Sequence, residues 1–179
     1  MVKIIAYLDI GIVQDFNYDF SIFPKIRENY INSISHEGRK KQSYFVFKLL
    51  IKILERYFTD YNINSLKVLD GKWFFENGPF FSFSHSNNIV AVAVSDDGPC
   101  VVDVEACSDK LLPFKKLNKE VNSSIDELAI FWTERECRVK ENSINSHINI
   151  ALFDVFNNKY ILSYGFVSNN NIKFYNACI

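Results

Sequence analysis

The sequence predicts an α+β fold, and three observations carry this prediction. Residues 38–58 place apolar side chains at helical spacing with charged residues between them. Residues 80–105 contain three short runs rich in β-branched residues, separated by turn residues. A second helical segment follows at residues 125–141. Short turns between strand runs favour antiparallel pairing, so we expect small antiparallel sheets packed against long helices.

The first segments of the chain are expected to form a strand and a helix. Residues 2–8 have the composition of a strand, although periodicity alone leaves a buried helical segment as the alternative. The helix at residues 38–58 starts with Arg39, Lys40 and Lys41. Their charges oppose the positive end of the helix dipole unless an anion or a carboxylate lies nearby.

A hairpin is expected after a polar linker. The runs at residues 80–84 and 89–95 are joined around Asn87-Asn88, and asparagine tolerates the positive φ of a tight turn. The sequence Asp96-Asp97-Gly98-Pro99 then predicts another turn, and a third β run follows at residues 100–105.

The remaining segments predict a loop, a helix and two strands. Residues 108–124 are polar and indicate a loop with a short helix in it. The helix at residues 125–141 has Ser123 or Ser124 as its N-cap. Two β runs, at residues 159–167 and 172–177, close the chain.

An internal similarity links two parts of the sequence. Residues 83–92 and 153–162 share a phenylalanine, an Asn-Asn pair and a β run after it. A duplicated α+β half with a seam near Gly98-Pro99 explains this similarity. Chance similarity in an asparagine-rich chain is the alternative.

The composition indicates one compact globular unit in a reducing compartment. The chain has 179 residues, 48% of them hydrophobic, and a formal net charge of -1, which argues against a nucleic-acid-binding protein. The four cysteines form no CxxC pair, so we expect free thiols and no structural zinc site. The start of the chain is too short and too polar for a signal sequence or a membrane span, so we expect a cytoplasmic protein.

Two carboxylates occupy alternate positions of the third β run. Asp103 and Glu105 flank Val104, and alternation along a strand sends both acids to one face. Their oxygens can then share one cation. An exposed strand end with two solvated acids is the alternative interpretation.

The second helix and the hairpin carry further polar residues. Glu136 and Lys140 are four residues apart on one helix face, with a surface ion pair as the alternative to a functional role. Trp132 of the same helix is either part of a site or plain core. His85 lies between Ser84 and Ser86, where it can donate to a phosphate oxygen or serve a structural role.

In their order and identities, these motifs resemble the signature of Sfp-type 4′-phosphopantetheinyl transferases. The similarity covers about residues 39 to 140 and has four parts: Gly71-Lys72, Phe81-Ser-Phe-Ser-His-Ser86, Asp103-Val-Glu105, and Trp132-Thr-Glu-Arg-Glu136 followed by Lys140. The sequence departs from the family pattern at three positions. Arg135 replaces the usual lysine, Val101 the usual glycine and Trp73 the usual proline.

The resemblance implies a fold and a division of the chain. It implies a pseudodimer of two similar α+β halves, residues 1–98 and 99–179, each a small antiparallel sheet packed with a long helix. Coenzyme A would bind between the halves, and the protein would be a monomer with no membrane or nucleic-acid partner.

The resemblance also implies the roles of individual residues. The metal ligands to magnesium would be Asp103, Glu105 and Glu136, with Glu136 also the general base toward a serine of an apo acyl or peptidyl carrier protein. Diphosphate oxygens would be bound by Lys140 and His85. The remaining coenzyme A contacts would come from Arg39, Lys40, Lys41, Lys72 and Ser84. A solvated basic helix start is the alternative interpretation of the four basic residues.

Electrostatics agrees with a cation at such a site. Each close pair of carboxylates costs about 4 kcal/mol at an effective dielectric constant near 20, so a cation or raised pKa values must accompany three of them. Two alternatives use the same residues: a metal-dependent nuclease or phosphatase, and a non-catalytic module that binds coenzyme A or a carrier protein.

Overall fold

The computed structural model describes residues 1–58, 60–116, 124–141, 147–155, 158–168 and 171–177. These residues form an α+β protein with three α-helices, two 3-10 helices and nine strands in mostly antiparallel sheets. The predicted α+β class is therefore confirmed. Within the described residues, no helix is long and apolar enough to cross a membrane.

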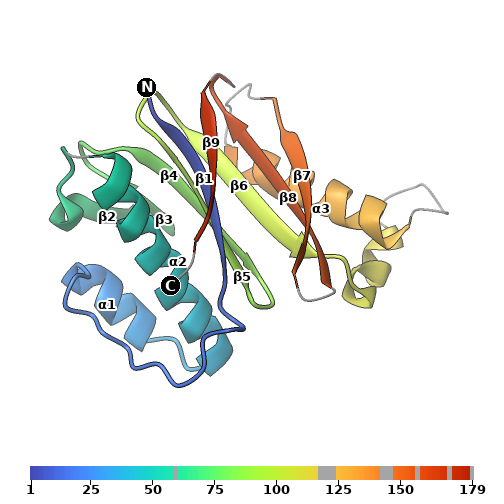
Figure 1. Cartoon of the computed structure of the whole chain (residues 1–179), viewed down its shortest axis with the longest axis horizontal. Helices are drawn as coiled ribbons and strands as arrows, with labels where there is room; N and C mark the ends of the chain where they lie inside the picture. Colours follow the sequence, from blue (N-terminus) through green and yellow to red (C-terminus); the bar gives the residue numbers. More distant parts are fainter. Residues whose placement is uncertain (59, 117–123, 142–146, 156–157, 169–170, 178–179) are drawn as a thin grey trace.

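The first sheet contains the first and last described strands, β1 and β9, and carries the longest described helix, α2, on one face (Figure 1). Its strand order is β4-β5-β1-β9, with β9 parallel to β1 and the other pairs antiparallel. Helix α2 buries its apolar face against alternate residues of β1 and β5, such as Ile4 and Val92. The bounds are β1 Lys3–Asp9, α2 Glu37–Tyr57, β4 Phe80–Ser86, β5 Ile89–Ser95 and β9 Ile172–Asn176.

The third sheet carries the second long helix. Its strand order is β6-β8-β7, all antiparallel, and α3 packs across β6 and β8. Ser124 caps α3, since its hydroxyl accepts from the Glu127 N–H at 3.2 Å while Glu127 accepts from the Ser124 N–H at 2.7 Å. Ser123 lies outside the described residues. The bounds are β6 Cys100–Ala106, α3 Ile125–Glu141, β7 Asn149–Val155 and β8 Asn158–Phe166.

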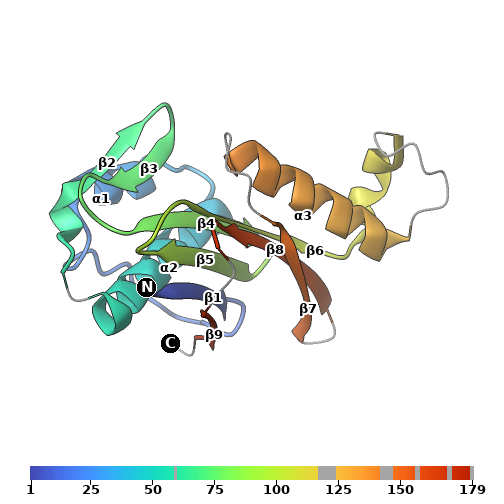
Figure 2. The same cartoon turned by 90° about the horizontal axis from the view of Figure 1, so that it is seen from above.

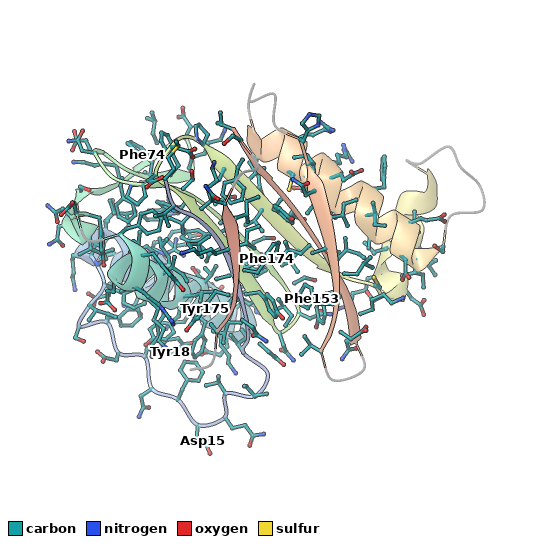
Figure 3. All side chains as sticks on the ribbon, turned by 45° about the horizontal axis from the view of Figure 1, so that its top comes forward. Asp15, Tyr18, Phe74, Phe153, Phe174 and Tyr175 are labelled. Carbon is teal, nitrogen blue, oxygen red and sulfur yellow. The ribbon has the colours of Figure 1, made fainter. Side chains whose placement is uncertain are left out.

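The inner faces of these two sheets share one apolar core. Ile5 and Ala91 from the first sheet pack in the same cluster as Val104 and Leu162 from the third. Aromatic pairs extend the contact, because Phe153 of β7, which is labelled in Figure 3, stacks on Tyr7 with 4.4 Å between ring centroids. The two sheets therefore lie face to face, with α2 and α3 on the outside.

The polar linker contains a second, two-stranded sheet that the sequence did not predict. Strands β2 (Leu66–Leu69) and β3 (Lys72–Phe75) pair across Asp70 and Gly71, both at positive φ. Helix α1 (Lys25–Asn32) was also missed, and it reaches this hairpin through Tyr30 and Trp73, whose rings are 5.3 Å apart. Short elements without strong periodicity give little signal in a sequence.

Serine side chains join β4 to β6, the strands at which the two large sheets meet. The hydroxyls of Ser82, Ser84 and Ser86 accept hydrogen bonds from the backbone N–H groups of Val102, Val104 and Ala106, at 3.2, 3.1 and 3.1 Å. We call these three bonds the serine ladder. The two strands belong to different sheets, so side chains here replace the backbone pairing of an ordinary sheet.

Most predicted elements are confirmed with ends shifted by one or two residues. The predicted hairpin turn is present, with Asn87 at a φ of 48°. The short helix expected within residues 108–124 is a 3-10 helix at Asp109–Lys116. Cys100, Cys107 and Cys137 are thiols outside any disulfide, as predicted, and Cys178 lies outside the described residues. Strand β7 was not predicted.

A buried ion pair fixes the turn that leads from β5 into β6. Lys3, 2% exposed, contacts Asp97 at 2.8 Å, and Ser95 donates to the same carboxylate at 2.6 Å. Burial alone would raise the pKa of Asp97, but the hydrogen bonds from Lys3 and Ser95 outweigh it and hold the pKa below its ordinary value. The stability gained from this shift is therefore present above the ordinary pKa of aspartate and is lost as the pH falls through the lowered value.

We predict that Asp97→Asn lowers the free energy of unfolding at pH 7 by roughly 3 kcal/mol, because it leaves the Lys3 ammonium buried without its counter-charge. Urea denaturation measures this change. Asp96→Asn is the matched control, and we expect it to stay within about 0.5 kcal/mol of the wild type. Equal stability of Asp97→Asn and wild type at neutral pH would contradict the prediction.

Candidate active site

A cavity of about 700 Å³ brings the sequence motifs together. Figure 2 shows the elements around it: α1 and β3 on one side, α3 on the other, and β4 and β6 between them. It is lined by residues from every predicted motif and by residues from α1 and α2: Arg27, Tyr30, Ile34, Arg39, Ser43, Val46, Gly71, Trp73, Phe83, Ser84, His85, Asp103, Val104, Glu105, Trp132, Glu136 and Lys140.

Asp103 and Glu105 of β6 form what we call the acidic end of the cavity, and Glu136 of α3 also lines the cavity. Asp103 is 6% exposed, and its Oδ1 accepts hydrogen bonds from Ser84 Oγ and Lys140 Nζ, both at 2.7 Å. Glu105 Oε1 accepts from Ser86 Oγ at 2.6 Å. The two acids lie on one face of β6, as strand alternation predicted.

Burial raises the pKa of Glu105 above its ordinary value. Hydrogen bonds from Ser86 and the Ala106 N–H oppose this rise, and the nearby Asp103 adds to it. A cation placed beside Glu105 would therefore favour the ionised carboxylate and reverse the shift.

Lys140 is held at the seam between β4 and β6. Its amino group donates to the carbonyl oxygens of Phe83 at 3.2 Å and Val102 at 3.0 Å, and to Asp103 Oδ1. All three ammonium protons thus have protein acceptors, and the ion pair is with Asp103 rather than with Glu136. A phosphate oxygen could bind Lys140 only by displacing one of these acceptors.

The carboxylate oxygens of the acidic end are suitable ligands for a hard cation such as Mg²⁺, provided that a substrate supplies further oxygen ligands. Within the described residues, no group of three His, Cys, Asp or Glu side chains is close enough to hold a metal ion by itself. Magnesium is commonly bound by one or two carboxylates with water and substrate phosphates as further ligands. The second oxygens of Asp103 and Glu105 accept no hydrogen bond from the part of the chain that the structure describes.

His85 lies on β4 between the acidic end and α2. His85 is an exposed position of β4, yet the protein around it partly desolvates the imidazole and lowers its pKa below the ordinary value, and the positive charges of Lys140 and Arg39 lower it further. Asp103 acts in the opposite direction. The imidazole is therefore neutral at pH 7 and gains a proton more readily when an anion binds beside it.

The opposite end of the cavity is basic and aromatic. The Arg27 guanidinium lies 4.8 to 5.5 Å from the ring centroids of four aromatic residues, Tyr30, Phe47, Trp73 and Phe83. Its Nη2 donates to Ser43, but Nε has no hydrogen-bond partner within the described residues. Burial lowers the pKa of Arg27 to about 10, so it stays charged at pH 7.

Arg27 is a site residue that the sequence reasoning missed. It lies outside the recognised motifs, and its neighbours come from four elements, so its place in the cavity depends on the tertiary fold. An arginine that is 3% exposed and has no carboxylate partner in the described structure is unusual, because burying an uncompensated charge is costly.

The other basic candidates are distributed differently. Arg39 lines the cavity, but Lys40 lies over the Tyr18 ring at 4.9 Å and Lys41 donates to the Val13 carbonyl at 2.8 Å. Lys72 borders two neighbouring cavities instead of this one. The structure therefore brings Arg39 to the other motifs but not these three lysines.

The three departures from the family pattern also have defined positions. Trp73 forms part of the ring cage of Arg27. Arg135 is exposed and lies over the Trp132 ring at 5.6 Å, outside the cavity lining. Val101 is buried, at 3% exposure.

Comparisons with known proteins do not identify the chain, since no protein-family model and no curated protein matches it.

We predict that His85 titrates below pH 6.5 in the free protein and that coenzyme A raises its pKa. The free value reflects partial desolvation of the imidazole and the two nearby cations, and a bound phosphate stabilises the imidazolium. NMR titration of the imidazole measures both values, with His36 as the control because it lies outside the cavity. A pKa that coenzyme A leaves unchanged would show that no phosphate binds next to His85.

Proposed function

We propose that the protein is a magnesium-dependent 4′-phosphopantetheinyl transferase. In this reaction a serine hydroxyl of an apo acyl or peptidyl carrier protein attacks the β-phosphorus of coenzyme A. The phosphoanhydride bond breaks, and adenosine 3′,5′-bisphosphate leaves. One observation supports this proposal most strongly: the residues that carry the family resemblance, His85, Asp103, Glu105, Glu136 and Lys140, line a single cavity.

The polarity of the cavity suits a nucleotide with a diphosphate. The basic end offers two positive charges, Arg27 and Arg39, and flat rings at Tyr30 and Trp73. Such a surface can bind an adenine ring and a phosphate. A diphosphate would then extend past His85 toward the acidic end.

The chain's own residues have separate tasks in this proposal. Asp103 and Glu105 would hold magnesium together with water and a diphosphate oxygen, and when bound the ion would act as a Lewis acid on the diphosphate and offset its charge. Glu136 accepts the proton of the carrier serine, directly or through a water molecule. His85 donates to a phosphate oxygen, and Lys140 keeps Asp103 in place through their ion pair.

Strand order supports the finer proposal of a pseudodimer. Strands β1, β5 and β4 are neighbours in that order, and so are β6, β8 and β7, each set with one long helix after its first strand. The similar segments of the sequence fall on the hairpins β4–β5 and β7–β8. A duplication of one α+β half accounts for both facts.

The decisive assay incubates the protein with magnesium, coenzyme A and a panel of apo carrier proteins and then weighs the carriers. We predict a mass gain of one phosphopantetheine and its loss in Glu136→Gln, because the amide cannot accept the serine proton. Glu134→Gln on the same helix is the matched control, since Glu134 does not line the cavity. Coenzyme A binding without transfer would indicate a binding module, and phosphoester hydrolysis without transfer a phosphoesterase.

We predict that Arg27→Met weakens coenzyme A binding by about 10-fold or more, because one hydrogen bond to a charged group contributes about 1.5–3 kcal/mol. Methionine keeps the apolar packing, so melting should change little. Isothermal titration calorimetry measures the affinity, with Lys41→Met as the control because Lys41 does not line the cavity. Unchanged affinity in Arg27→Met would contradict a phosphate site at the basic end.

A further inference from the structure

We propose that the hydroxyls of Ser84 and Ser86 are positioning groups that orient Asp103 and Glu105 toward a divalent cation. The inference rests on the proposed function for its cation. It gives Ser86 a role for the first time and gives Ser84, expected from the sequence to contact coenzyme A, a role in holding a metal ligand. It comes from a repeated contact along the serine ladder.

Each of the two hydroxyls makes two hydrogen bonds to neighbouring residues of β6. Ser84 accepts from the Val104 N–H at 3.1 Å and donates to Asp103 Oδ1 at 2.7 Å. Ser86 accepts from the Ala106 N–H at 3.1 Å and donates to Glu105 Oε1 at 2.6 Å. Two serines of β4 therefore each bridge a backbone N–H of β6 and the carboxylate of the preceding β6 residue, with the same geometry.

These contacts leave little freedom to the hydroxyl protons. Ser84 and Ser86 are 9% and 8% exposed, so water does not compete freely for them. A hydroxyl has a single proton to donate, and a nearby N–H occupies its acceptor side. The proton therefore points to the carboxylate, engages one oxygen and leaves the second oxygen of each acid for another partner.

The first serine of the ladder provides an internal control. Ser82 accepts from the Val102 N–H at 3.2 Å, as the other two serines accept from their amides. Its neighbour at the position equivalent to Asp103 and Glu105 is Val101, which has no carboxylate. Loss of the Ser82 hydroxyl therefore removes a ladder bond without removing an orienting bond.

Groups that orient metal ligands without touching the metal change metal affinity by about 10–100-fold when they are removed. The test titrates the full-length protein, at saturating coenzyme A so that the diphosphate can complete the site, with Mn²⁺ and follows the free ion by electron paramagnetic resonance. We expect Ser84→Ala and Ser86→Ala to weaken Mn²⁺ binding about 10-fold or more and Ser82→Ala to stay within about twofold of wild type.

A second pair of variants guards against loss of folding. Ser86→Cys keeps nearly the same volume but has a weak donor, so it should also bind Mn²⁺ less tightly. Ser86→Thr keeps the hydroxyl and should bind as wild type does. Equal losses in all three alanine variants, unchanged affinity in Ser84→Ala and Ser86→Ala, or no Mn²⁺ binding by wild type would each overturn the inference.

The same variants separate this inference from the proposed function. Orientation by serines stands on the Mn²⁺ pattern alone, even if the wild type transfers no phosphopantetheine to any carrier. Conversely, phosphopantetheine transfer by the wild type together with unchanged Mn²⁺ affinity in Ser84→Ala and Ser86→Ala would support the proposed function and refute the positioning role.

Discussion

The structure depends on the register between β4 and β6, which the serine ladder sets. Three such hydrogen bonds contribute only about 0.5–1.5 kcal/mol each, far less than the apolar core that the two sheets share. The ladder therefore decides alignment more than stability. A shift of β6 by one residue would turn Asp103 toward the apolar core, where an unpaired carboxylate is costly.

This register explains the polarity of the cavity. With β6 in place, its two acids face α3, and Lys140 enters the seam to neutralise Asp103. At the other end Arg27 stays charged with no carboxylate partner among the residues that the structure describes, and it is held by aromatic rings and by Ser43. An anionic ligand would stabilise the buried Arg27 guanidinium. The phosphate oxygens of the same ligand could also complete the coordination of a divalent cation at Asp103 and Glu105.

The sequence predicted what strong local patterns encode. Helices α2 and α3 and the β4–β5 hairpin followed from helical periodicity and from the turn at Asn87. The residues of each motif could be recognised in the sequence because they lie within a few positions of one another. Arg27 and the Asp103 partner of Lys140 could not be found in this way, because helical spacing shows which face a residue occupies but not what lies opposite. Short elements such as α1 and β2 were missed because they contain too few residues to show a periodic pattern of apolar side chains.

A crystal structure of the protein with Mn²⁺ and coenzyme A tests the central claim most directly, since manganese is located by its anomalous scattering. The account predicts one manganese peak in contact with Asp103 and Glu105, a diphosphate oxygen beside it, and the serine ladder unchanged. Coenzyme A bound elsewhere, or a manganese ion away from these two carboxylates, would contradict it.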